Sequence, residues 1–136
     1  SYDYVVDLGG SEIGANVLGR FHDDINPEEV DFLMVVNIYR PETNSVEEIC
    51  KQMEMLEQKS GYKITGFVNN SNLIHETTLE NILAGDELLR EVTKKTGVLV
   101  RYTTCMLEEV SELEELSKRV QGEVFPMHYK MRESWM

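Results

Sequence analysis

Four polar stretches each follow a run of apolar residues, at the point where a strand is expected to end. They are 7–10 (Asp-Leu-Gly-Gly), 37–42 (Asn-Ile-Tyr-Arg-Pro-Glu), 69–72 (Asn-Asn-Ser-Asn) and 103–105 (Thr-Thr-Cys). In open parallel α/β sheets, ligands bind beyond the carboxyl ends of the strands, because loop amides and helix N-termini converge there. The sequence therefore predicts a ligand site at one edge of a sheet, shared by Asp7, Arg40, Asn69 and Thr104.

Asp7 and the two glycines that follow Leu8 have the residue types of a magnesium-phosphate site. In such sites a strand-end carboxylate holds a metal-bound water, and a glycine amide approaches the terminal phosphate closely. Asp7 and Gly10 fit these two roles. A strand-end aspartate that caps a turn has the same pattern, and the residues alone favour neither interpretation.

The stretch from Gly9 to Gly14 matches the G-x-x-x-x-G part of a phosphate loop placed between a strand and a helix. Such a loop is completed by a lysine, which neutralises phosphate charge, and by a serine or threonine, which binds the metal. Ala15 and Asn16 stand at these two positions. The glycine spacing is therefore interpreted as accidental, and the sequence offers no other phosphate cradle.

Apolar runs and helical spacing predict the elements that position these residues. Strands are expected at 4–6, 32–39, 64–70 and 98–104, and helices at 13–21, 45–59, 78–96 and 107–120, with a helical turn at 26–29. The 78–96 helix is expected to be interrupted at Gly85. Strands that alternate with amphipathic helices favour right-handed crossovers. The predicted fold class is α/β, a three-layer α/β/α arrangement on a mainly parallel sheet, in a single domain over residues 1–136.

The composition disfavours some functional classes. The 136 residues are 41% hydrophobic and carry 13 Lys and Arg against 25 Asp and Glu, which gives a net charge of -12. Such an acidic surface argues against broad binding of nucleic acid or anionic lipid. The chain shows neither a transmembrane segment nor a secretory signal, and Cys50 and Cys105 lack metal-site spacing. We therefore expect a cytoplasmic protein with reduced thiols.

Other polar residues have no spacing that indicates a site. His22, His75 and His128 are isolated, which is typical of surface or turn residues. The acidic residues of 108–115 recur at helical spacing beside leucines. This pattern favours a solvated helix face over a cation site.

Three motifs follow one another along the chain in a family-like order. Residues 2–10 read Tyr-Asp-Tyr-Val-Val-Asp-Leu-Gly-Gly, residues 35–46 contain a strand followed by Pro-Glu-x-x-Ser, and residues 64–70 read Ile-Thr-Gly-Phe-Val-Asn-Asn. This order resembles the second half of the ParA/MinD family of deviant P-loop ATPases. There a YDYVVID-type strand carries the Walker B aspartate into switch II, and the asparagine of a G-x-V-x-N strand contacts adenine. The likeness covers most of the chain, from Ser1 to about Val120.

The resemblance implies a partial P-loop NTPase fold and a nucleotide ligand. It assigns roles to seven residues: the metal side to Asp7, the phosphate side to Gly9 and Gly10, the base side to Asn69 and Asn70, and the border of the site to Pro41 and Glu42. The implied ligands are ATP and Mg, bound only together with an N-terminal half that carries the family's K-G-G-x-G-K-[ST] loop. The chain lacks that loop, and Leu-Gly-Gly stands where the family has a Thr-Pro-rich segment.

Without the phosphate loop the chain is not expected to hydrolyse ATP alone, since phosphoryl transfer depends on a positioned lysine and backbone amides. The start at Ser1, close to an apolar run, predicts a truncated or processed product with a bare sheet edge. Such a chain is expected to pair with its missing N-terminal half or to form a homo-oligomer. Two function hypotheses stay open: the C-terminal portion of a ParA/MinD-like nucleotide-binding ATPase, and a non-catalytic protein-interaction domain that kept the fold.

Overall fold

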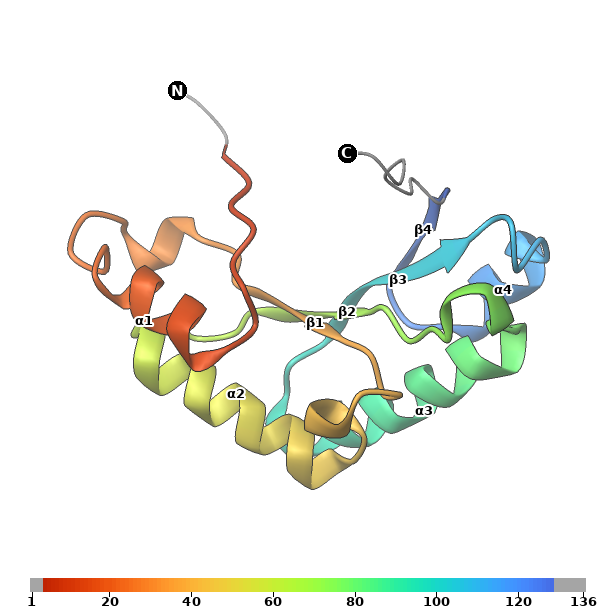
Figure 1. Cartoon of the computed structure of the whole chain (residues 1–136), viewed down its shortest axis with the longest axis horizontal. Helices are drawn as coiled ribbons and strands as arrows, with labels where there is room; N and C mark the ends of the chain where they lie inside the picture. The colour runs from red at the N-terminus through yellow and green to blue at the C-terminus, as the bar shows by residue number, and fades with distance from the viewer. Residues whose placement is uncertain (1–3, 129–136) are drawn as a thin grey trace, which may run out of the picture.

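A four-stranded parallel sheet forms the centre of the computed structural model, which describes residues 4–128. The strand order is β1-β2-β3-β4, with β1 at Leu33–Val36, β2 at Gly66–Asn69, β3 at Val100–Met106 and β4 at Glu123–Met127. All three strand pairings are parallel. The predicted α/β class with a parallel sheet is confirmed (Figure 1). It is consistent with a three-layer α/β/α arrangement, of which the described residues build the sheet and one helical layer.

The helices alternate with the strands along the chain. They are α1 at Glu12–Gly19, α2 at Val46–Ser60, α3 at Leu79–Thr96 and α4 at Leu113–Arg119, with short 3-10 turns at Pro27–Glu29, Pro41–Thr43 and Ile74–Glu76. The hydroxyl of Ser45 caps the start of α2 by accepting from the amide of Glu48. Gly61 and Gly97 end α2 and α3 in the left-handed conformation, which glycine adopts without steric cost.

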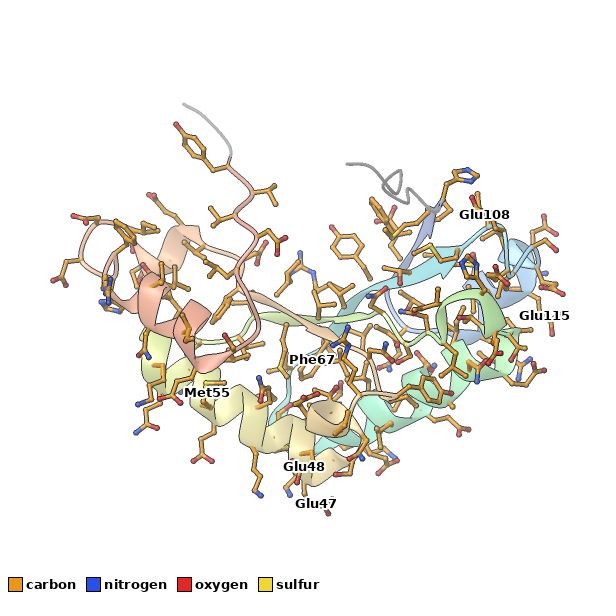
Figure 2. The ribbon with its side chains drawn as sticks, in the orientation of Figure 1. Glu47, Glu48, Met55, Phe67, Glu108 and Glu115 are labelled. Atoms are coloured by element: carbon orange, nitrogen blue, oxygen red, sulfur yellow. The ribbon has the colours of Figure 1, made fainter. Side chains whose placement is uncertain are left out.

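One face of the sheet is packed against α2 and α3, which lie below it in Figure 1. Because the strands are parallel and in register, Val36, Asn69, Thr103 and Val124 form one row across this face. Met34, Val36 and Phe67 join buried side chains of α2 and α3 in a single apolar core. A second, smaller core forms where Cys105 meets α3 and α4. Phe67 points from β2 toward the helices (Figure 2), and we refer to this as the covered face.

The opposite face has no helix over it among residues 4–128, and we refer to it as the open face. It carries Val35, which is 60% exposed, and Phe125, which is 54% exposed. The ring of Tyr102 packs edge-on against Phe125 with 6.3 Å between ring centroids. The acidic side chains of Glu47 and Glu48 instead lie on the outer side of α2, away from the sheet (Figure 2).

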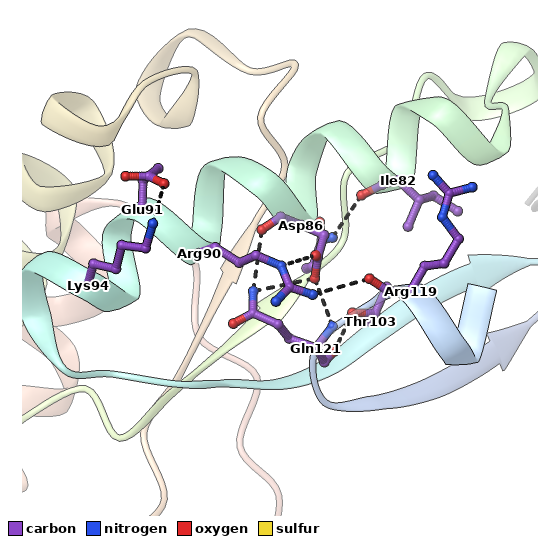
Figure 3. A network of polar contacts seen from close by, with 9 residues as sticks. Ile82, Asp86, Arg90, Glu91, Lys94, Thr103, Arg119 and Gln121 are labelled. Carbon is purple, nitrogen blue, oxygen red and sulfur yellow. Dashed lines mark hydrogen bonds and ion pairs between the residues drawn. The ribbon is translucent and has the colours of Figure 1, made fainter. Parts of the chain in front are cut away.

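A buried carboxylate ties α3 to the turn before β4 (Figure 3). Asp86 is 2% exposed and accepts from Arg90 Nε at 2.8 Å and from the backbone amide of Gln121 at 2.8 Å. The backbone oxygen of Gln121 in turn accepts from the hydroxyl of Thr103 at 3.0 Å. The charge of Asp86 is thus compensated inside the fold, as a buried ion requires.

The strand predicted at residues 4–6 is wrong. Residues 4–9 carry no helix or strand, although Val5 and Val6 are apolar and β-branched. A strand needs a neighbour to pair its backbone groups, and no segment among residues 4–128 pairs with this one. Residues 2 and 3 of the same motif lie outside the described residues.

The continuity of α3, the start of the last helix and the existence of β4 also differ from the sequence prediction. Helix α3 is continuous through Gly85, so the predicted interruption is wrong. The last helix begins at Leu113 rather than near Leu107, because β3 continues to Met106 in register with β4. Strand β4 was not predicted, and it contains Pro126, which a strand tolerates at the edge of a sheet.

Candidate functional site at the carboxyl edge of the sheet

The loops after β1 and β2 are joined by a pair of asparagines. Asn37 Nδ2 donates to the backbone oxygen of Asn72 at 3.2 Å, and Asn37 Oδ1 accepts from the amide of Asn72 at 3.3 Å. The same oxygen accepts from the amide of Tyr39 at 3.0 Å. The carboxamide of Asn37 thus pairs with backbone groups much as a neighbouring strand would. It fixes the two loops relative to each other at the carboxyl edge.

Further hydrogen bonds position the Pro41–Thr43 turn beside these loops. The amide of Ile38 donates to Ser71 Oγ at 3.2 Å, and Thr43 Oγ1 donates to the backbone oxygen of Asn37 at 2.7 Å. Pro41 and Glu42 are exposed within this turn. The structure therefore places the Pro41–Glu42 segment and the Asn69–Asn70 segment at the same edge of the sheet.

Asn69 is fully buried and its carboxamide is committed to the chain. Its Nδ2 donates to the backbone oxygen of Ile82 at 3.2 Å, and its Oδ1 accepts from the amide of Ser71 at 3.2 Å. A Cβ added at Gly85 would lie 2.3 Å from Ser71 Oγ and 2.7 Å from Asn69 Oδ1. Gly85 therefore lets α3 approach the end of β2 closely. Asn69 braces this contact, and its side chain offers no atom to a ligand in this arrangement.

Asn70 is half-buried and lies on the open-face side of the same strand end. Its Oδ1 accepts from Thr104 Oγ1 at 2.5 Å, which links the loop after β2 to β3. Its Nδ2 group has no hydrogen-bond partner within residues 4–128. Thr104 therefore orients the Asn70 carboxamide, and Asn70 keeps a donor for a ligand.

Tyr39 is a feature of this edge to which the sequence reasoning gave no role. Its ring is 37% exposed, and its hydroxyl contacts both the backbone oxygen of Asn81 at 3.3 Å and Asn81 Nδ2 at 3.1 Å. These contacts hold the ring between the end of β1 and the first turn of α3. The available signal was an aromatic residue directly after a strand-end asparagine, a place suited to stacking on a flat ligand.

Asp7, Gly9 and Gly10 do not share this arrangement. The backbone oxygen of Gly10 accepts from Gln52 Nε2 at 2.6 Å, which places Gly10 against the middle of α2. Asp7 is exposed and makes no hydrogen bond or ion pair with another described residue. Arg40 and Asn69 lie at the carboxyl ends of β1 and β2 as the sequence predicted, whereas Thr104 lies within β3, which continues to Met106, and is level with the loop after β2. Asp7 follows no strand in residues 4–128, so that edge does not extend to it.

The residues around Gly10 do not fit a magnesium-phosphate group. Ser11 caps α1 by accepting from the amide of Gly14 at 3.5 Å, so one of the helix's N-terminal amides is already used. Ala15, at the position of a phosphate-loop lysine, is buried at 2% exposure. Residues 4–128 contain no cluster of three or more His, Cys, Asp and Glu side chains that could hold a metal.

Comparisons of the chain with models of protein families, with curated proteins and with solved structures found no match. Among the residues that the structure places, no helix has both the length and the apolar character needed to cross a bilayer.

Proposed function

We propose that this chain is the C-terminal portion of a ParA/MinD-like nucleotide-binding ATPase, which supplies the base side of a nucleotide site and is inactive alone. The observation that carries the proposal is the polar cluster of Asn37, Asn70, Asn72 and Thr104 at the carboxyl edge of an all-parallel sheet. Ligands of open α/β sheets bind at this edge. The proposed setting is the cytoplasm, where the free thiols of Cys50 and Cys105 remain reduced.

The chemistry of the cluster suits a flat heterocycle with hydrogen-bond acceptors. Asn70 Nδ2 is a donor without a partner in residues 4–128, and Thr104 fixes its direction. A ring nitrogen of adenine is an acceptor of matching type. The ring of Tyr39, half-exposed beside the same loops, offers a surface on which a base can stack. Asn70 therefore carries the proposed hydrogen bond to the base, while Asn69 supports the loop.

The phosphate side of the proposed site depends on a segment that the described residues do not supply. Asp7 and Gly10 lie apart from the strand-end cluster, and no lysine accompanies them. ATP and Mg are proposed as ligands only when a lysine-containing phosphate loop is present. The open face, with Val35 and Phe125 exposed, suits the packing of such an N-terminal half as a further layer.

A non-catalytic interaction domain is the second candidate. It is favoured by the apolar open face, since exposed apolar surface of this kind marks interaction sites. It is also favoured by the separation of Asp7 from the strand-end cluster. Under this function the chain binds a protein through the open face and has no affinity for a base.

Amide NMR spectra of 15N-labelled chain titrated with adenosine distinguish the two candidates. We expect shifts of the Asn70 side-chain amide and of the backbone amides in 37–40 and 70–72, with residues 9–12 unaffected. Asn70→Asp removes the free donor while keeping the oxygen that accepts from Thr104, so it should abolish these shifts. Asn44→Asp adds the same charge at an exposed position of the same edge and should leave them unchanged. Shifts elsewhere, or none, would contradict the base site.

A further inference from the structure

Leu73 and Ile74 are exposed apolar residues on the turn that leads from β2 into α3. Their exposed fractions within residues 4–128 are 41% and 58%. We propose that residues 129–136 of the same chain, which we call the C-terminal segment, dock on these two side chains and cover them. The C-terminal segment lies outside the described residues. The proposal does not depend on the proposed nucleotide function.

The turn holds Ile74 in a backbone conformation that β-branched residues rarely adopt. Its φ is 56°, and no other non-glycine residue in 4–128 has a positive φ. The amide of Ile74 donates to Asn72 Oδ1 at 3.1 Å. Thr77 Oγ1 accepts from the amide of Leu73 at 2.8 Å and donates to the backbone oxygen of Ile74 at 2.8 Å. These bonds fix the strained turn, so it presents both apolar side chains in one geometry, as a preformed contact surface requires.

Two histidine–glutamate contacts place the last described residue close to this turn. His128 Nδ1 lies 2.9 Å from Glu108 Oε1, beside the end of β4 (Figure 2). His75 Nδ1 lies 3.3 Å from Glu109 Oε1. The two glutamates are consecutive, and His75 directly follows Ile74. Eight residues span up to about 26–29 Å when extended. The C-terminal segment is therefore long enough to reach the turn from His128.

The C-terminal segment has the apolar side chains that such a surface binds. It reads Tyr-Lys-Met-Arg-Glu-Ser-Trp-Met, so half of its residues are aromatic or methionine. Methionine adapts to irregular apolar surfaces, and tryptophan offers the largest apolar area of any side chain. We therefore expect Trp135 to make the main contact with Leu73 and Ile74.

The charges around the turn favour the same occupant. Glu76, Glu108 and Glu109 lie on or beside the turn, in a chain whose net charge is -12. The C-terminal segment carries two basic residues, Lys130 and Arg132, and one acidic residue. Opposite charges attract, although exposed pairs contribute little to stability. The charges therefore orient the segment, and the apolar contact holds it.

The chain's own segment is the occupant, rather than a second copy, because of where it is attached. Its first residue is bonded to His128, which contacts Glu108 beside the turn. A segment tethered by so short a linker has an effective concentration on the order of millimolar at the surface. The corresponding segment of a second copy would have to reach that concentration to compete.

Trp135 is the only tryptophan of the chain, so its fluorescence reports the docking directly. We expect the emission of the folded chain to be shifted to the blue relative to a synthetic 129–136 peptide, equally at every chain concentration. Ile74→Gly removes the apolar side chain and suits a positive φ, so the variant should stay folded. Its emission should shift to the red, toward that of the peptide. Leu99→Gly removes a similarly exposed side chain before β3 and should keep the parent emission.

Three results of this experiment would overturn the proposal. A parent emission equal to that of the peptide would show that Trp135 is not docked. An unchanged emission in a folded Ile74→Gly variant would place Trp135 against another surface. A blue shift that grows with chain concentration would make a second copy the occupant.

Amide NMR spectra test the same contact from the side of the turn. Trp135→Ala should shift the backbone amides in 73–76 and leave those in 97–99 unchanged. Ser134→Ala is the matched control in the same segment and should shift neither group. Unshifted amides in 73–76 for Trp135→Ala would contradict the docking. Neither experiment uses a nucleotide, so the result is separate from that of the base-binding test.

Discussion

The two faces of the sheet are built from alternate residues of the same strands and have opposite environments. Val36 on the covered face is fully buried, while its neighbour Val35 on the open face is largely exposed. Phe67 is likewise buried and Phe125 largely exposed. The apolar character of a strand therefore does not report which face is packed within this chain. It indicates how much apolar contact the strand can make. On the open face, the described residues do not make that contact.

The strongest test of this comparison removes one phenylalanine from each face. Phe67→Ala should lower the free energy of unfolding by about 3–5 kcal/mol, since it leaves a cavity in the core. Phe125→Ala should lower it by less than about 1 kcal/mol in the monomer, since its ring is half in solvent already. Urea denaturation measures both. Equal losses would show that the open face is packed in solution.

An ion pair with a buried carboxylate and an ion pair in solvent give a second comparison. Asp86→Ala should cost about 2–4 kcal/mol of unfolding free energy, because it leaves the part-buried amide of Gln121 without its acceptor as well as removing the partner of Arg90. Asp31→Ala breaks the exposed pair with Arg101 and should cost at most about 1 kcal/mol. Thermal unfolding of the two variants checks the order, and a larger loss for Asp31→Ala would contradict it.

Two glycine substitutions test how closely α3 approaches the end of β2 on the covered face. Gly85→Ala should destabilise the chain by about 1–3 kcal/mol, because the added methyl collides with Ser71 and Asn69 at the end of β2. Gly10→Ala meets no neighbouring atom and should be close to neutral. Amide NMR spectra of Gly85→Ala should also show shifts of the backbone amides in 69–72. An unaffected stability would mean that α3 does not lie this close to β2.

The two thiols give the smallest expected effect. Burial, followed by the negative charge of Glu112, raises the pKa of the Cys105 thiol above its ordinary value. The unfolded chain then loses this proton at a lower pH than the folded chain. Stability contributed by Cys105 is therefore complete below the ordinary thiol pKa and declines as the pH rises from there through the raised pKa of the folded chain. Cys105→Ala should flatten this alkaline decline, and a thiol reagent should modify the half-buried Cys50 much faster than Cys105.

The parts of the fold that were predictable are those with a local signal. Helix α2 follows from its apolar spacing, the Ser45 cap and Gly61, and β1 follows from its apolar run. The segment at 4–6 carries the same kind of signal as β1, yet it forms no strand, because a strand is defined by its partner. Strand β4 was missed for the opposite reason, since register with β3 rather than its own composition makes it a strand.

The candidate site was predictable in location but not in residue roles. Strand ends in a parallel sheet share one edge, so the meeting of the 37–42 and 69–72 loops follows from the fold class. The roles of Asn69 and Asn70 depend on strand alternation in three dimensions, which turns the first carboxamide toward α3 and the second toward Thr104. Sequence spacing alone treats the two asparagines as equivalent.

The most direct test of the functional account compares adenosine with Mg-ATP by calorimetric titration of the same chain. Under the proposed function the chain supplies the base side of the site and not the phosphate side, so we expect both ligands to bind weakly and with equal affinity. An affinity for Mg-ATP at least about tenfold higher than for adenosine, a difference of about 1.4 kcal/mol, would reveal a phosphate site and contradict the account.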